Sequence, residues 1–190
     1  MDFVTELTRF AATGRLGDFH VGAHLYDLVA AKGEPEWSDR VDEASPWPHW
    51  YCYGDLQIVF CECRLLERMY VPAWHAELEV PGTGRDAAYT VRTRVTEPRL
   101  TAAFTRAGLV WQTQTYENLP DQRTLVTEPS PGIMTGFLFA PPVADDGGSP
   151  EGPQAAKGAD WVLYKASTAV LRGHACPDPA GFRPDDGYGA

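Results

Sequence analysis

Histidine and cysteine side chains are the first candidates for metal chemistry in this chain. His20 and His24 are four residues apart, a spacing that on a helix would let both side chains hold one ion. Gly22 lies between them, and no glutamate or cysteine follows at ligand spacing. Two ordinary histidines are therefore the favoured interpretation, because such a pair alone is a weak signal.

The four cysteines are Cys52, Cys61, Cys63 and Cys176. Cys61 and Cys63 form a C-x-C pair, whose sulfurs would point to the same face of a strand. A zinc site needs two further ligands, which Cys52 or His75 could supply only if the sheet brought them close. Because the C-x₂-C pairs typical of zinc sites are missing, we expect reduced cysteines with a structural role, no bound metal and no cofactor.

Catalytic signatures are missing from the sequence. It contains no nucleophile elbow, P-loop, dinucleotide fingerprint, H-E-x-x-H motif or kinase signature. A Cys–His pair that meets only in the folded chain stays open as an alternative. We therefore predict no catalytic residue.

Aromatic residues between Trp37 and Tyr53, interleaved with acidic side chains, form the most distinctive pattern. Tryptophan and tyrosine are favoured anchors of protein interfaces, and nearby carboxylates suit a basic partner surface. We predict that a partner-binding surface includes residues 34–49. The predicted contact residues are Trp37, Asp39, Asp42, Glu43, Trp47 and Trp50. The alternative is that the rings fill the core, and we expect at least half of them to do so because each can bury a large area.

Net charge narrows the class of partner. The chain has 26 acidic and 16 basic residues and a formal net charge of −10. Nucleic-acid binding depends on Lys and Arg against phosphates, and an anionic membrane surface attracts basic segments, so both are disfavoured. The same charge would steer a basic protein towards this one, although it also serves solubility alone.

Location and overall class follow from composition. Residues 1–6 lack the basic segment of a signal peptide, and no apolar run approaches the roughly 18 residues of a membrane span. We therefore expect a cytoplasmic protein. Hydrophobic residues make up 44% of the chain and charged residues 22%, as in ordinary globular proteins.

Local patterns predict an α+β protein. Apolar spacing and end signals predict helices at 2–13, 23–32 and 96–107, with Gly14, Gly33 and Gly108 as stops. Alternation predicts strands at 50–53, 56–60, 65–71, 74–80, 89–95, 109–116, 123–128, 133–140 and 161–170. The prolines within residues 34–49 predict a polar loop, since proline cannot donate to a central strand.

The expected architecture is an antiparallel sheet, or two joined sheets, with helices packed on one face. A turn-rich segment at 81–85 divides an N-terminal α+β half, residues 1–81, from a C-terminal α+β half, residues 85–175. Residues 176–190 read as a flexible tail, and residues 141–160 as an exposed, protease-sensitive loop. Both halves show a helix, a glycine, a Trp-bearing segment and two apolar strands, so an internal duplication stays open.

The first half carries a weak resemblance. Residues 21–35 give a glycine, a short helix and Gly-x-Pro, residues 50–60 a Tyr-Gly-led strand, and residues 65–71 an apolar strand. This order resembles bacterial immunity proteins that partner secreted toxins. Its Gly–helix–Gly start is also similar to the tandem-repeat β-lactamase inhibitors and OmlA-type modules. The resemblance implies a non-enzymatic immunity protein that occludes the active site of a toxin; a small enzyme with an unrecognised site and a scaffolding module are the alternatives.

Overall fold

A computed structural model describes residues 2–43, 45–82, 85, 87–142, 160–170 and 176. The helices are α1 (Phe3–Thr13), α2 (Leu25–Lys32) and α3 (Glu97–Arg106). The strands are β1 (Arg15–Leu16), β2 (Phe19–His20), β3 (Trp37–Asp42), β4 (Ser45–Tyr53), β5 (Leu56–Phe60), β6 (Leu66–Pro72), β7 (Glu77–Pro81), β8 (Ala88–Arg92), β9 (Gln112–Tyr116), β10 (Leu119–Ser130), β11 (Ile133–Ala140) and β12 (Val162–Val170).

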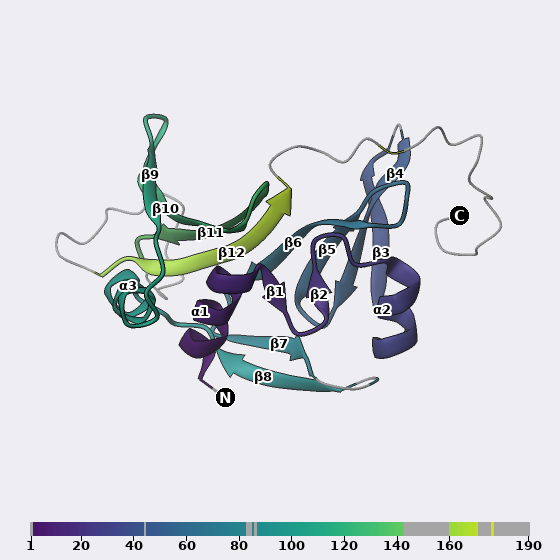
Figure 1. Ribbon diagram of the computed structural model, residues 1–190, viewed down its shortest axis with the longest axis horizontal. Helices are drawn as coiled ribbons and strands as arrows, with labels where there is room; N and C mark the ends of the chain where they lie inside the picture. Colours follow the sequence, from purple (N-terminus) through teal and green to yellow (C-terminus); the bar gives the residue numbers. More distant parts are fainter. Residues whose placement is uncertain are drawn as a thin grey trace, which may run out of the picture.

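One antiparallel eight-stranded sheet organises the molecule, in the order β3-β4-β5-β6-β12-β11-β10-β9 (Figure 1). Strands β3–β6 follow α2 in the chain, and strands β9–β12 follow α3, so each half contributes a helix and a four-stranded meander. The two meanders join where β12 pairs with β6, from Lys165 opposite Pro72 to Ala169 opposite Arg68. The predicted α+β class is confirmed.

The three helices lie on the same side of this sheet (Figure 1). Phe137 of β11 meets the rings of Phe10 from α1 and Phe104 from α3, with centroids 6.1 and 5.2 Å away. Thr127 of β10 donates a 2.8 Å hydrogen bond to the Ala11 carbonyl of α1. The core therefore lies between the helices and what we call the inner face of the sheet; the opposite face is the outer face.

Local signals located the helices correctly. Gly14 adopts a left-handed backbone (φ 66°), which glycine tolerates without steric cost, and its N–H bonds the Phe10 carbonyl at the end of α1. Gly33 ends α2, and Pro98 occupies the first turn of α3. The strand alternation at 56–60 also matches β5, whose Leu56, Ile58 and Phe60 are buried.

The prediction of a polar loop at 34–49 is wrong for most of its length. Residues 37–42 and 45–53 pair as the β3–β4 hairpin, with Trp37 opposite Cys52 and Arg40 opposite His49. Proline is tolerated because β5 pairs with β4 only from His49 to Tyr53. Pro46 and Pro48 therefore lie in a part of β4 that requires no N–H donor towards β5.

Two strand boundaries also differ from expectation. The strand predicted at 123–128 begins earlier, because residues 119–130 form β10, and Tyr116 of β9 pairs with Leu119 across a turn at residues 117–118. Residues 74–76, predicted as the start of a strand, precede β7.

The boundary predicted at 81–85 separates two paired strands. Pro81 of β7 lies opposite Ala88 of β8, so the flanking segments form one small two-stranded sheet. Residues 143–159 of the predicted exposed loop, and 177–190 of the predicted tail, lie outside the described residues. Among the helices described, none is long and apolar enough to cross a membrane.

Candidate functional site

The predicted aromatic site is divided between the two faces of the sheet. Trp50 and Cys52 alternate along β4 with the buried Tyr51 and Tyr53 and therefore belong to the outer face. Trp37 of β3 lies directly opposite Cys52, so it belongs to the same face. Asp39 lies directly opposite Trp50 on the same face. Trp37 is 53% exposed, which identifies it as the ring most available to a partner.

The outer face is hollowed beside these rings. Trp37, Arg40, Trp50, Cys52 and Gln57 line an open hollow of about 330 Å³. A typical small-molecule pocket encloses most of its ligand, whereas this hollow is open, a shape that suits an inserted side chain of a protein partner.

A row of ring contacts extends from the hollow along the outer face. The Trp50 ring lies 5.3 Å from that of Tyr70 on β6. The Lys165 ammonium from β12 then lies 5.0 Å from the Tyr70 centroid. Contacts of this kind fix side-chain orientation before any partner arrives, because the rings stack on one another and on a cation.

Trp47 occupies the other face. Its ring contacts that of His49 at 5.3 Å, and the Arg64 guanidinium lies 4.5 Å from its centroid. Trp47 is partly buried and packs against the core. The structure therefore does not bring Trp47 together with Trp37 and Trp50, although all three were predicted to belong to one site.

The acidic members of the predicted site lie on the β3–β4 hairpin. Asp39 and Glu43 are exposed, and Glu43 follows the end of β3. The Asp42 backbone pairs with Ser45, while its side chain lies outside the described part of the structure.

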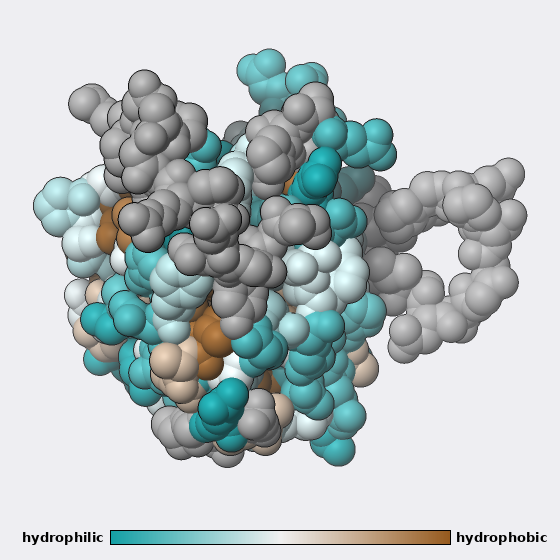
Figure 2. Space-filling model, turned by 90° about the vertical axis from the view of Figure 1, so that its right-hand side faces the viewer, coloured by the Kyte–Doolittle hydropathy of each residue, from teal (hydrophilic) through white to brown (hydrophobic). Residues whose placement is uncertain are grey.

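Seen from the β3 side, hydrophobic residues form small patches between hydrophilic ones (Figure 2).

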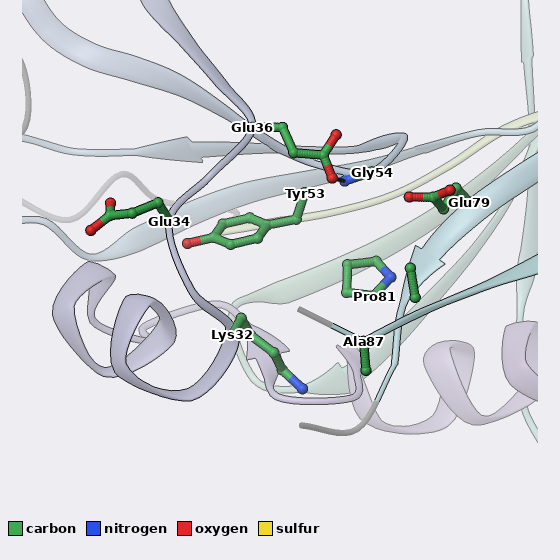
Figure 3. Close-up of a pocket in the computed structure, with 9 residues that line it drawn as sticks. Lys32, Glu34, Glu36, Tyr53, Gly54, Glu79, Pro81 and Ala87 are labelled. Atoms are coloured by element: carbon green, nitrogen blue, oxygen red, sulfur yellow. Dashed lines mark hydrogen bonds between the residues drawn. The ribbon is translucent and has the colours of Figure 1, made fainter. Parts of the chain in front are cut away.

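A second pocket, of about 160 Å³, lies between α2, the β4–β5 turn and the β7–β8 pair. Glu34 and Glu79 lie at opposite ends of it with Tyr53 between them (Figure 3). The Lys32 ammonium forms a 2.6 Å ion pair with Asp18 and donates to the Gly82 carbonyl.

Backbone contacts explain why this second pocket exists. The Gly54 N–H donates to a carboxylate oxygen of Glu36, and a Cβ at Gly54 would lie 2.9 Å from the Glu79 carbonyl oxygen. Glycine is required at this turn because its backbone is left-handed (φ 55°) and approaches β7 closely. These contacts give the pocket residues a role in fastening α2 and β4 to the β7–β8 pair.

The histidine pair identified in the sequence forms ordinary contacts. The His20 Nδ1 lies 2.9 Å from the Val21 carbonyl oxygen, and the His24 Nδ1 accepts a hydrogen bond from the Tyr26 N–H at the start of α2. Neither histidine joins a group of three or more metal-ligating side chains among the described residues.

Three of the four cysteines converge, which the sequence did not predict. The Sγ atoms of Cys61, Cys63 and Cys176 all lie within 4.8 Å of one another. Burial is the main cause that raises the pKa of the Cys61 and Cys63 thiols, and it also raises the pKa of Cys52. A reactive nucleophilic cysteine needs a lowered pKa, so the thiols of Cys52, Cys61 and Cys63 are poorly suited to covalent catalysis.

The C-x-C pair was visible in the sequence, but its partner was not. Cys176 carries no local signal, and neither Cys52 nor His75 belongs to the cluster among the residues described.

No family model, curated protein or solved structure matches this chain.

Proposed function

We propose that this protein is a cytoplasmic, non-enzymatic binding protein, an immunity protein that neutralises a bacterial toxin by occluding its active site. The observation that carries the proposal is the outer-face surface of Trp37, Trp50 and Asp39. It combines an exposed ring, a half-buried ring and a carboxylate on one side of a paired hairpin. Interface anchors are enriched in tryptophan because its large rigid ring buries much area for few rotatable bonds.

Rigidity supports the role of this surface. Trp37 and Trp50 lie on strands held by backbone pairing, and Trp50 is further held against Tyr70. Binding costs free energy whenever a mobile side chain must be ordered. A hairpin whose strands are already paired reduces that cost more than the proline-stiffened loop predicted from the sequence would have done.

Charge specifies the kind of partner. The chain has a formal net charge of −10, and Asp39 and Glu43 are exposed on the same hairpin as Trp37. A toxin domain with a basic active-site cleft would be attracted over a distance of about one Debye length, roughly 8 Å at physiological salt. The partner is therefore a basic protein surface, not nucleic acid or an anionic membrane.

The direct test is neutralisation. A toxin encoded beside this gene is purified, and its activity is measured while the protein is added. We expect activity to fall to the background level at one equivalent, with an association rate that slows as salt increases. Binding without loss of toxin activity would favour a scaffolding role, and the absence of both would contradict the proposal.

A further inference from the structure

The three clustered cysteines come from two distant parts of the chain. Cys61 and Cys63 lie in the turn between β5 and β6 and are 4% and 8% exposed, respectively. Cys176 follows the end of β12 and is half-buried. The register of the sheet places the end of β12 beside the start of β6, because Ala169 pairs with Arg68, and Cys176 lies beyond that end in the chain.

The turn that carries Cys61 and Cys63 is held rigidly. The Cys61 N–H donates to the Leu65 carbonyl at 3.0 Å, and the Arg64 N–H donates to the Cys61 carbonyl at 2.9 Å. Arg64 has a left-handed backbone (φ 63°), which is uncommon outside glycine and persists only where surrounding contacts enforce it.

The segment before α2 holds the same turn from outside. The Leu25 N–H donates to the Arg64 carbonyl, and the Leu66 N–H donates to the Ala23 carbonyl, each at 2.9 Å. The two sulfurs of the turn are therefore positioned by backbone contacts that do not depend on Cys176. A preorganised pair of ligands of this kind lowers the cost of binding a third ligand and an ion.

The number and spacing of the sulfurs indicate what they hold. All four cysteines whose state is described are free thiols, and a disulfide requires two sulfurs about 2.05 Å apart. Any disulfide within the cluster would leave one sulfur over. An ion with metal–sulfur bonds of about 2.3 Å holds its sulfur ligands roughly 3.8–4.0 Å apart, which uses all three and agrees with separations below 4.8 Å.

We propose that Cys61, Cys63 and Cys176 form a three-thiolate site for a thiophilic d¹⁰ metal ion, Zn²⁺ or Cu⁺, which ties the segment after β12 to the β5–β6 turn. Thiolate ligands select these soft or borderline ions over Mg²⁺ and Ca²⁺, which prefer oxygen. Zn²⁺ would complete four-coordination with one further ligand, whereas Cu⁺ is satisfied by three sulfurs. The proposal departs from the sequence-based expectation of no bound metal, for which only Cys61 and Cys63 of the three ligands were recognised.

Metal titration of the reduced, metal-free full chain tests the site. Zn²⁺ is added in competition with a chromophoric chelator, and Cu⁺ is added anaerobically in competition with a Cu⁺ chelator. We expect one ion per chain from at least one titration, and the stronger competitor identifies the ion. Cys61→Ser and Cys176→Ser should weaken that affinity by more than the roughly 10–100-fold caused by losing a supporting outer-shell contact.

Cys52→Ser is the matched control, because Cys52 lies on the outer face of β4 outside the cluster. It should retain the stoichiometry and affinity of the wild type. A second readout, alkylation followed by mass spectrometry, should show that the bound ion protects Cys61, Cys63 and Cys176 but leaves Cys52 unprotected. It remains informative if Cys61→Ser does not fold.

Three results would overturn the site. They are failure of reduced wild-type protein to bind either ion, equal binding by folded Cys176→Ser, and a Cys61–Cys176 or Cys63–Cys176 disulfide that forms in air in place of any metal binding. The titration involves no toxin, so its failure would leave the proposed immunity function untouched, and failure of toxin neutralisation would leave the metal site untouched.

Discussion

The β3–β4 and β9–β10 hairpins occupy equivalent places at opposite edges of the sheet but carry different chemistry. Each is the first hairpin after the helix of its half. All five residues of β9 are exposed, and four of them are glutamine or threonine. On β3, by contrast, Trp37 and Asp39 face outwards beside Trp50. The sheet topology therefore provides two similar edges, and the side chains of each edge decide whether it suits a partner that binds through aromatic contacts.

The connections that follow differ as well. The five-residue turn at 61–65 joins β5 to β6 and contains two of the clustered cysteines. The equivalent connection, from β11 to β12, spans residues 141–161. A short turn held by backbone hydrogen bonds can fix ligand geometry, which makes the first half the place for a preorganised site.

The largest effect is expected from a core change that tests whether the two halves unfold together. Phe137→Ala should lower the free energy of unfolding by about 3–5 kcal/mol, because a fully buried ring between α1 and α3 is lost. If the shared sheet is one cooperative unit, hydrogen exchange should accelerate in β5 of the first half as well as in β11. Leu138→Ala, on the half-buried outer face, is the control and should cost less. Retained protection in β5 would indicate independently stable halves.

The next effect separates the two hairpins as binding surfaces. Trp37→Ala should weaken toxin binding by about 2 kcal/mol or more, roughly 30-fold, while changing thermal stability little. Tyr116→Ala is the matched change on β9, where Tyr116 is 39% exposed, and it should leave toxin affinity unchanged. Isothermal titration calorimetry measures both. Equal losses would show that the edges do not differ in the way proposed.

Trp47 should behave differently from Trp37, although the two are close in sequence. Trp47→Ala should lower the free energy of unfolding by about 1–3 kcal/mol, through lost packing and the lost contact with Arg64. Toxin affinity should change little, because the ring lies on the inner face. Denaturation and calorimetry on the same preparations check the pair of effects. A variant that binds weakly but unfolds normally would place Trp47 in the interface.

The smallest effect concerns Tyr51, which faces inwards between the two outer-face positions Trp50 and Cys52. Its hydroxyl is buried without a hydrogen-bond partner among the described residues, and this burial raises its pKa. Tyr51→Phe should therefore increase stability at pH 7 by about 0.5–1 kcal/mol, because a desolvated polar group is removed.

The same substitution has an alkaline signature. A raised pKa means that the folded state holds the phenol proton more tightly than the unfolded state, whose pKa is about 10. Below pH 10 the phenol is protonated in both the folded and the unfolded state, and the wild-type protein keeps its full stability. Above pH 10 the unfolded state loses the proton first, so the free energy of unfolding of the wild type falls as pH rises towards the folded pKa. The advantage of Tyr51→Phe should therefore grow above pH 10 in pH-dependent denaturation. An advantage that shrinks there would contradict the assignment.

Sequence patterns predicted the parts of the fold that depend on near neighbours. Apolar spacing and terminal glycines located α1 and α2, and alternation located β5, because helical and strand periods are set by residues a few positions apart. The class of the fold followed from these elements. Composition likewise gave the net negative charge, which we propose attracts a basic partner to the β3–β4 hairpin.

Other features were decided by partners far away in the chain. The prolines of β4 indicated a loop because proline has no N–H to donate. However, β5 pairs with β4 only from His49 to Tyr53, so Pro46 and Pro48 need no donor towards β5, and their local sequence does not show where that pairing ends. Successive residues of a strand point to opposite faces of the sheet, and this alternation separates Trp47 from Trp50. Because residues 34–49 were predicted to be a loop, the faces of these rings could not be predicted.

The helices, most of the strands and the net charge could be predicted from the sequence, because each arises from local periodicity or from composition. Tertiary structure alone decided that β6 pairs with β12, that Trp37 and Trp50 share a face without Trp47, and that Cys176 meets Cys61 and Cys63. These features depend on which distant segments form backbone hydrogen bonds with each other and bury a common face of the sheet. No short stretch of sequence records that pairing.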